Sequence, residues 1–356
     1  MFYTEMNDNQ RRIFIDIVQL YDAFGAAFKK DRSHMGGMHW KKAKGREYLF
    51  RSHDRYGYGK SLGPRSPETE KILADFRLAK QQAKSHLSAL QDRLKEQARF
   101  CKAAMIQRVP RIVAGILRVL DQHNIFGRNV IVVGTNAMYA YEAAAGVFFD
   151  SSMMSTKDVD ILWDIRRKLT LATDSAGKPA GLLDIIRKAD RSFESVRSGS
   201  FRAVNKDGYM VDLIKPLPKK IMKKESVRIG GPGDLEAVEI RNLHWLISSP
   251  KFVQIVIGDD GIPAPMIVPD PRAFALHKFW LSSQDDREPV KKQRDHGQAI
   301  AVGRLIVEHL PQYRFDASEL RMFPLEVVQK ATNLFDLSFP QPVSGKIVPS
   351  TTQKHI

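Results

Sequence analysis

Three aspartates of this chain lie where buried strands are expected. Asp158 and Asp160 are two residues apart in STKDVDILWD, and Asp212 lies among apolar residues in GYMVDLIKP. Because alternate residues of a strand share a face, Asp158 and Asp160 are expected to point the same way. Carboxylates this close repel each other unless a cation lies between them. The pattern therefore predicts a divalent cation, Mg²⁺ or Mn²⁺, held by all three aspartates, which would be the catalytic residues of a phosphoryl-group reaction.

Other interpretations of these aspartates stay open. Asp158 or Asp160 could be a strand residue that faces water. Asp212 could be a core carboxylate that accepts hydrogen bonds from the backbone.

A glycine turn precedes the aspartates. The segment VIVVGTNAMYAYEAA reads as a strand, a Gly134-Thr135 turn and a helix. A turn at a helix N-terminus offers backbone N–H groups to an anion. Gly134 would let a phosphate approach the backbone, and the Thr135 hydroxyl would donate a hydrogen bond to it.

Residues 129–149 are apolar, but Asn136 and Glu142 lie inside them, which favours a buried strand and helix over a membrane span.

The order of these motifs has a known parallel. A Gly-Thr turn before a helix, a DVD strand and a later strand aspartate resemble the polymerase-beta-like nucleotidyltransferase fold. More narrowly, the chain resembles bacterial nucleotidyltransferase-fold proteins and the nucleotidyltransferase toxins of toxin–antitoxin and abortive-infection systems. The likeness to the fold covers about residues 126–300, and GGMHWKKAKGREYLFRSH and GPRSPETEKI also resemble the first of these families. The resemblance implies transfer of a nucleoside monophosphate from an NTP to an acceptor, with release of pyrophosphate.

The toxin-type relatives add a lysine on a helix after the core and then an Arg-Asp pair. Lys278 in DPRAFALHKFWL and Arg294-Asp295 in KKQRDHGQA match that pattern. By resemblance, Lys278 would contact the triphosphate, Asp295 would orient a catalytic or phosphate-binding group, and an antitoxin protein is a possible partner. Lys278 could instead be a surface lysine whose stem lies along the protein.

The elements that must position these residues predict an α+β fold. A mixed sheet with flanking helices is expected over residues 126–270, with a helical N-terminal extension over 1–125, a helical C-terminal lobe over 271–338 and a disordered tail over 339–356. The expected strands are 129–133, 159–163, 210–214, 237–241, 253–257 and 266–268, with helices over 136–145 and 182–189. A long helix is expected after Ser66, which is a good N-cap, and another after Pro110.

A basic segment of the extension bears on the acceptor. Residues 29–65 hold eleven Lys and Arg against three Asp and Glu, which is half of the net charge of +16. HWKKAKGREYLFR reads as a hairpin with its turn near Lys44-Gly45. Cations attract phosphates, and exposed aromatic rings stack on unpaired bases. We therefore expect the acceptor to be RNA, of a tRNA-like kind, docked by four cations of the hairpin: Lys41, Lys42, Lys44 and Arg46.

Alternatives to an RNA acceptor also stay open. The aromatic residues of the hairpin could bury it against the core, and the positive charge could belong to a generally basic surface. The acceptor would then be a small molecule or a protein. A non-catalytic protein that only binds nucleic acid is a further possibility, against which the set of three aspartates argues.

The compartment follows from two observations. Cys101 is the only cysteine, which excludes an internal disulfide and suits a reducing environment. The first residues, MFYTEMNDNQRRIF, show no basic stretch followed by an apolar one, so no secretory signal is expected. We therefore expect a cytoplasmic protein that does not bind membranes.

Overall fold

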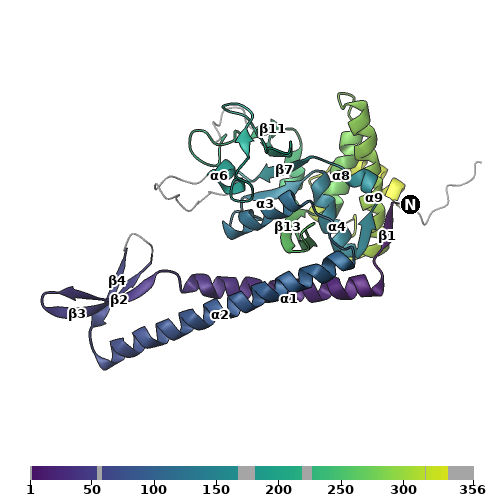
Figure 1. The fold of residues 1–356 in the computed structure, drawn as a ribbon. Helices are drawn as coiled ribbons and strands as arrows, with labels where there is room; N and C mark the ends of the chain where they lie inside the picture. Colours follow the sequence, from purple (N-terminus) through teal and green to yellow (C-terminus); the bar gives the residue numbers. More distant parts are fainter. Residues whose placement is uncertain (1, 54–57, 167–180, 219–226, 317, 336–356) are drawn as a thin grey trace, which may run out of the picture.

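The computed structural model describes residues 2–53, 58–166, 181–218, 227–316 and 318–335. Most of the molecule is a mixed sheet with flanking helices, and two long antiparallel helices lead from it to a small separate sheet (Figure 1). This is the α+β fold that the sequence predicts. The expected tail, residues 339–356, lies outside the described residues. Within the described ranges, none of the helices combines the length and the apolar composition needed to cross a membrane.

The central sheet consists of short strands in a mixed arrangement. They are β5 (Val130–Val133), β7 (Asp158–Trp163), β8 (Glu194–Ser195), β9 (Arg202–Val204), β10 (Met210–Pro216) and β11 (Val238–Ile240). The order is β5, β7, β10, β9, β8, and β11 pairs with the C-terminal end of β10. β7, β10 and β11 are parallel, whereas β5 and β9 are antiparallel to their neighbours.

The pairing register puts four residues in one row across this sheet. Val133 of β5 lies opposite Asp160 of β7, Asp160 lies opposite Asp212 of β10, and Asp212 lies opposite Arg202 of β9. Because directly paired residues project to the same face, the two aspartates and Arg202 share one side of the sheet. The alternate residue Ile161 points to the other face and is fully buried.

Helices cover the sheet and build the C-terminal part. They are α3 (Arg111–Gln122), α4 (Met138–Ala145), α5 (Ser151–Met154), α6 (Leu182–Ile186), α7 (Leu243–Ser248), α8 (Pro271–Ser282), α9 (Pro289–His309) and α10 (Leu325–Phe335), with 3₁₀ turns η1 (Thr135–Ala137) and η2 (Ser318–Leu320). The apolar face of α3 is buried in the main core. α8 and α9 pack against each other, and α10 packs on both. A hairpin of β12 (Lys251–Ile257) and β13 (Pro263–Pro269) packs against α3 and α4.

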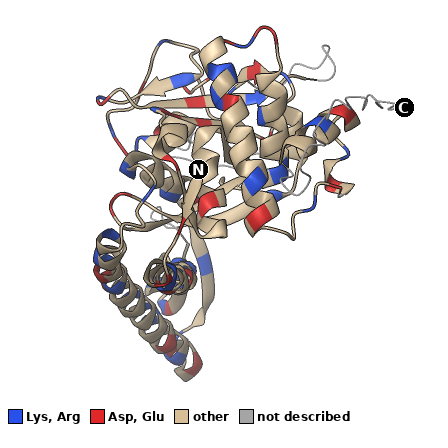
Figure 2. Ribbon diagram, turned by 90° about the vertical axis from the view of Figure 1, so that its right-hand side faces the viewer, with Lys and Arg blue, Asp and Glu red and all other residues tan. Residues whose placement is uncertain are grey.

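The N-terminal arm is formed by α1 (Asp8–Ser33) and α2 (Pro67–Ala103). The Ser66 side chain caps α2, as the sequence predicts, and Pro67 is its first residue. Blue Lys and Arg residues are interspersed with red Asp and Glu along the arm helix that Figure 2 shows lengthwise. Ile17 of α1 and Leu94 of α2 join Ile257 of the core in a second apolar cluster, which fixes the base of the arm. Strand β1 (Tyr3–Glu5) pairs with β6 (Val147–Phe149) and ties the chain's start to the core.

The far end of the arm carries a three-stranded antiparallel sheet. Its strands are β2 (Gly37–Ala43), β3 (Arg46–Ser52) and β4 (Gly59–Pro64). Lys44 and Gly45 form the turn between β2 and β3 with φ values of +49° and +75°, as a tight hairpin requires. The predicted hairpin and its turn are therefore confirmed. The sequence did not predict β4, because its two glycines and terminal proline oppose strand formation.

Candidate active site

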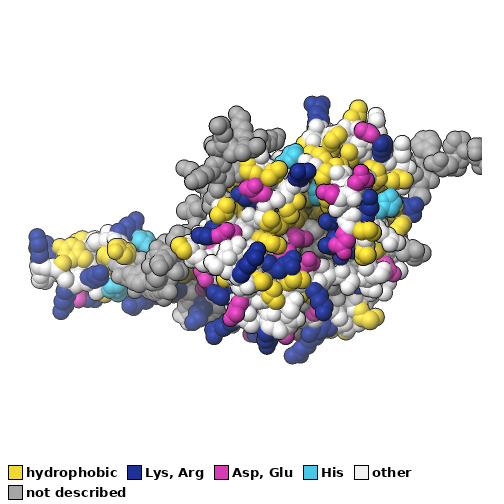
Figure 3. Space-filling view, turned by 90° about the horizontal axis from the view of Figure 1, so that it is seen from above, with side chains coloured by type: hydrophobic (Ala, Val, Ile, Leu, Met, Phe, Trp, Pro, Cys, Tyr) yellow, Lys and Arg dark blue, Asp and Glu magenta, His cyan; other side chains and the backbone are white. Residues whose placement is uncertain are grey.

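The three aspartates line one cavity of about 310 Å³ on the face of β7 and β10 that lies opposite to the side chain of Ile161. Asp158 and Asp160 alternate along β7, and Asp212 lies beside Asp160 on the parallel neighbour. Figure 3 looks down on this side of the molecule and shows hydrophobic and acidic side chains around a hollow, with Lys and Arg near its edge. Because Asp158 and Asp160 are two residues apart on β7, both side chains face the same cavity, as the spacing predicts.

Asp160 lies in an environment that opposes its negative charge. Burial raises the pKa of its carboxyl group to about 7, and the charges of Asp158 and Asp212 add to the rise. Lys278 and Arg202 lower this pKa, but by less. A divalent cation bound among the carboxylates would relieve the repulsion and favour the ionised form.

Asp212 is buried and already has a cationic partner. Arg202 of β9 donates from Nε to Oδ1 at 2.7 Å and from Nη2 to Oδ2 at 2.6 Å. This bidentate pair raises the pKa of the guanidinium, chiefly through the hydrogen bond to Asp212. Arg202 is a site residue that was not predicted from the sequence. The signal was present, because Asp207-Gly208 is a typical hairpin turn and folding RAVNKDGYMVD about it brings Arg202 opposite Asp212.

Asp158 is positioned through its backbone. The Nδ2 of Asn136, in the turn after Gly134, donates to the Asp158 carbonyl oxygen at 2.6 Å, and the Tyr209 hydroxyl donates to the same oxygen at 3.2 Å. The Thr156 hydroxyl donates to Asp158 Oδ1. Residues on both sides of β7 therefore hold the start of the strand in place beside the cavity.

The donor set suits a hard divalent cation such as Mg²⁺ or Mn²⁺, since carboxylate oxygens are the ligands these ions prefer. As the side chains stand, no group of three His, Cys, Asp or Glu in the described part of the chain is arranged to hold a metal ion. The ion pair with Arg202 occupies both oxygens of Asp212. The residues fit a cation if Asp212 exchanges the guanidinium for it.

Gly134 lies against Asp160. Its φ is +68°, and a Cβ atom at this position would lie 2.3 Å from Asp160 Oδ2. Both the backbone conformation and the contact require glycine. The approach of a phosphate to Gly134 stays a prediction, and in the structure the glycine also leaves room for the Asp160 carboxylate.

Thr135 lies in the interior. It is 5% exposed, and its Oγ1 accepts a hydrogen bond from Gln298 Nε2 at 3.1 Å. Gly134 lines the cavity, but Thr135 is not among the lining residues. In this arrangement the hydroxyl ties the turn to α9, and its expected hydrogen bond to a phosphate stays a prediction.

Lys278 and Asp295 form a buried pair beside the carboxylates. Lys278 is 6% exposed and lines the cavity, so the interpretation of it as a surface lysine is wrong. Its Nζ lies 2.6 Å from Asp295 Oδ1, and Arg287 Nη2 lies 2.6 Å from Asp295 Oδ2. Burial lowers the pKa of Lys278, and the charge of Asp295 counteracts this. Asp295 thus orients Lys278 and Arg287, both of which line the cavity.

The rest of the cavity divides into an apolar and a cationic part. Lys291 and Arg294 of α9 are exposed and add positive charge to that of Lys278 and Arg287. His277 also lines the cavity; burial lowers its pKa to about 3, so the ring is neutral, and its Nε2 has no hydrogen-bond partner among the described residues. The apolar wall comprises Val133, Ile214, Ile240, Leu243, Leu246, Phe274 and Leu281.

The four cations assigned to RNA lie far from this cavity along the chain's arm. Lys41, Lys42, Lys44 and Arg46 are all exposed around the β2–β3 turn. The Lys41 ammonium lies 3.7 Å from the centre of the Phe50 ring. Trp40, Tyr48 and Phe50 are half-buried and Tyr58 is exposed, whereas Tyr56 lies outside the described residues.

Comparison with known proteins identifies the chain's relatives at the level of a family. A protein-family model described as Nucleotidyltransferase matches residues 111–323. The matched range is more than half of the chain and contains every residue that lines the carboxylate cavity. The arm and its terminal sheet precede it. No curated protein and no solved structure matches the chain.

Proposed function

The chain belongs to the nucleotidyltransferase family, and we propose that it transfers a nucleoside monophosphate from an NTP to RNA in a reaction that depends on a divalent metal ion. The observation that carries the metal-dependent reaction is the convergence of Asp158, Asp160 and Asp212 on a cavity that Lys278 also lines. Such a cation, when bound, would polarise the phosphoryl group and stabilise the charge that develops on it.

Each group of residues around the cavity has a separate role in this reaction. Asp158, Asp160 and Asp212 hold the metal ion, and Asp212 is also the candidate base for the acceptor hydroxyl. The cationic side attracts the triphosphate, with Lys278 held in position by the buried Asp295. Gly134 leaves space for the leaving phosphates. The apolar wall receives the nucleoside, and the unpartnered Nε2 of His277 is available to a polar atom of it.

The RNA acceptor is supported by the sheet at the end of the arm. Four of its exposed cations, Lys41, Lys42, Lys44 and Arg46, surround a turn that projects away from the core (Figure 1). A small-molecule substrate would need no contact so distant from the carboxylates, whereas a folded RNA is large enough to reach both. We propose accordingly that residues 1–125 serve docking and that residues 126–270, with the lobe over 271–338, serve catalysis.

The docking proposal is tested by neutralising Lys41, Lys42, Lys44 and Arg46 together. Because each cation lost removes a phosphate contact, RNA affinity should fall and its dependence on salt should flatten, while NTP affinity stays unchanged. A control of equal charge change neutralises four exposed cations of the core: Arg191, Arg197, Lys206 and Lys330. If both variants bind RNA alike, the sheet does not dock it.

The identity of the acceptor separates RNA from the alternatives. The protein is incubated with each labelled NTP, Mg²⁺ and total RNA, together with cell proteins and small metabolites. Label in the RNA fraction supports the proposal. Label on protein or on a small molecule favours the alternative nucleotidyltransferase, and RNA binding without any transfer favours a binding protein.

A role as a toxin or defence component is a finer proposal that rests on the resemblance of the lysine and Arg-Asp motifs. It predicts that expression of the wild-type chain in the cytoplasm arrests growth and that Asp160→Asn does not. An antitoxin partner would then be a protein whose co-expression restores growth. Equal growth with wild type and variant would remove this role but would leave the transfer reaction untouched.

A further inference from the structure

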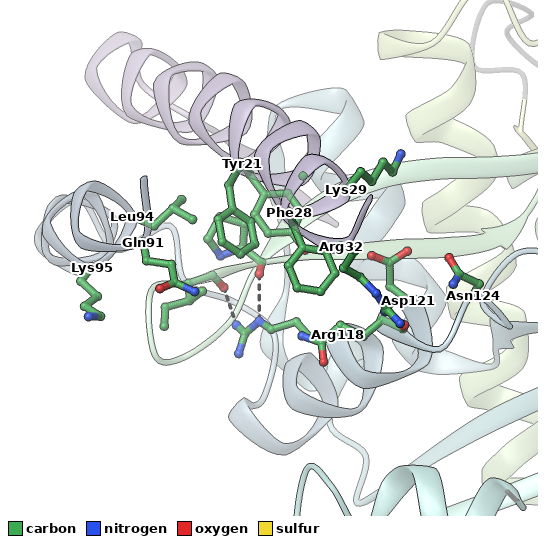
Figure 4. Close-up of a pocket in the computed structure, with 15 residues that line it drawn as sticks. Tyr21, Phe28, Lys29, Arg32, Gln91, Leu94, Lys95, Arg118, Asp121 and Asn124 are labelled. Carbon is green, nitrogen blue, oxygen red and sulfur yellow. Dashed lines mark hydrogen bonds between the residues drawn. The ribbon is translucent and has the colours of Figure 1, made fainter. Parts of the chain in front are cut away.

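A second, larger cavity of about 650 Å³ lies where the arm meets the core (Figure 4). α1 and α2 form one side of it, and α3 with the β12–β13 turn forms the other. It shares no lining residue with the carboxylate cavity. Its volume is within the range of small-molecule sites. The proposed transfer reaction makes no use of it.

One wall of this cavity is a ladder of aromatic rings on α1. Tyr21, Phe24 and Phe28 recur at helical spacing, so they share one face of the helix. The Tyr21 and Phe24 ring centres are 6.0 Å apart with planes at 30°, and those of Phe24 and Phe28 are 6.2 Å apart at 29°. The Arg32 guanidinium lies 5.8 Å from the Phe28 ring centre and extends the ladder. All three rings are half-buried and keep exposed surface toward the cavity.

The opposite wall is polar. Figure 4 shows Arg118, Asp121 and Asn124 across from Tyr21 and Phe28. Arg118 binds the β12–β13 turn. Its guanidinium pairs with Asp260 at 2.9 and 3.0 Å and donates hydrogen bonds to backbone carbonyl oxygens of that turn. It therefore fixes the wall in place. Gln122 and Asn124 add amide groups that can donate and accept hydrogen bonds, and Gln91 adds another from the side of α2.

Cations surround the ring ladder. Lys29 and Arg32 lie on α1 at one end of the cavity, and Lys95 lies on α2 at the other end (Figure 4). Lys29 is exposed and has no ion pair among the described residues. Lys95 pairs with Asp92 at the surface, where both side chains are about 70% exposed, so this pair is weak and exchangeable. The cavity therefore combines flat apolar rings, amides and an excess of positive charge, with one carboxylate, Asp121, whose pKa burial raises and the charge of Lys29 lowers by less.

We propose that this cavity binds a nucleotide, with the base on the rings of Tyr21, Phe24 and Phe28 and the phosphate toward Lys29, which follows Phe28 on α1. Aromatic rings stack on any base, and cations attract its phosphate. Amide side chains opposite the rings match the hydrogen-bonding edge of a base. The nucleotide is either an unpaired residue of an RNA that follows the arm or a free nucleotide, and the two sources share this chemistry.

A larger side chain at Gly25 would fill the cavity. Gly25 lines the cavity in the middle of α1, and a Cβ atom at this position would meet nothing within 4 Å. Gly25→Leu therefore fills empty space and also replaces a poor helix former. Gly25→Ala is the matched control, because it gives the same gain in helix propensity but leaves most of the space open.

The test measures binding to the full chain with EDTA present, so that the metal-dependent site does not contribute. The probes are a short single-stranded RNA of mixed sequence and each 5′-nucleoside monophosphate. We expect Gly25→Leu to weaken binding at least about tenfold, and Gly25→Ala to leave it near the wild-type value. A second variant, Phe24→Leu with Phe28→Leu, keeps the wall apolar but removes the rings and should weaken binding similarly.

The outcomes are distinct. If Gly25→Leu weakens RNA binding only, the occupant is an unpaired RNA residue; if it also weakens mononucleotide binding, a free nucleotide suffices. If neither probe loses affinity in Gly25→Leu and the ring variant, the cavity does not bind nucleotides. Failure of the transfer reaction does not affect this result, because no carboxylate of that site takes part.

Discussion

Arg202 lies directly opposite Asp212 on neighbouring antiparallel strands and binds both oxygens of its carboxylate, at 2.7 and 2.6 Å. Asp212 in turn lies beside Asp160 on the parallel strand β7. The guanidinium thus supplies the positive charge that three neighbouring carboxylates need. A metal ion bound to Asp212 would compete with Arg202 for the same oxygens, so Arg202 would set how readily the site accepts the ion.

Arg202→Ala should therefore raise the affinity for Mn²⁺, measured by titration calorimetry, by about tenfold, which corresponds to one charge-assisted hydrogen-bonded pair. It should also lower the free energy of unfolding without metal, because Asp212 is left buried and unpaired. Arg197→Ala removes an exposed arginine nearby and serves as the control. An unchanged Mn²⁺ affinity in Arg202→Ala would show that the pair does not compete with the metal.

Gly134→Val should lower both NTP and metal affinity, because its side chain would overlap Asp160 Oδ2. The positive φ adds a conformational cost of about 1 kcal/mol or more. Binding titrations and urea unfolding measure the two effects. Gly146→Ala is the control, because Gly146 has φ +66° and a Cβ there would come no closer than 3.8 Å to Arg11. A folded Gly134→Val protein with unchanged NTP affinity would disprove the role of this turn.

Asp295→Asn should weaken NTP binding although the residue does not line the cavity. Without its charge, Lys278 and Arg287 lose their common partner, and burial favours the neutral form of Lys278. Loss of one partner of a buried pair costs about 3 kcal/mol of stability. Asp285→Asn, an exposed aspartate in the connection between α8 and α9, should change neither quantity. Wild-type NTP affinity in Asp295→Asn would mean that Lys278 needs no positioning.

Local patterns predicted much of the fold and the positions of the aspartates. The alternation in DVDILW placed Asp158 and Asp160 on one face, and Ser66-Pro67 marked the start of α2. Pairing between distant segments carries no such signal. Strand β1, for example, pairs with β6 more than 140 residues away, whereas the place of Arg202 opposite Asp212 could have been predicted from the nearby Asp207-Gly208 turn. The burial of Lys278 likewise depends on how α8 packs against α9 and not on the sequence of either.

The buried Glu142 carboxyl group should make the free energy of unfolding depend on pH, independently of the active site. It is 2% exposed, and burial raises its pKa from 4.5 to about 7, while Arg108 only partly offsets this. Between about pH 4.5 and 7, the Glu142 carboxyl group is therefore protonated in the folded state and ionised in the unfolded state. The stability from this proton is full below about pH 4.5 and is lost as the pH rises through 7. Urea unfolding of wild type and Glu142→Gln should diverge accordingly, with the wild type losing up to about 1.4 kcal/mol per pH unit relative to the variant. Parallel pH profiles would contradict the assignment.

The central claim is that the three carboxylates hold a metal ion for nucleotidyl transfer, and Asp160→Asn tests it most directly. The substitution removes a charge but hardly any volume, and it relieves repulsion in a half-buried site, so the variant should be at least as stable as the wild type. The decisive measurement is transfer of label from α-³²P-labelled NTPs to total RNA, with Mn²⁺ binding determined in parallel on the same samples. We predict that the wild type binds Mn²⁺ and labels the RNA and that folded Asp160→Asn does neither. Transfer by Asp160→Asn at the wild-type rate would contradict the account.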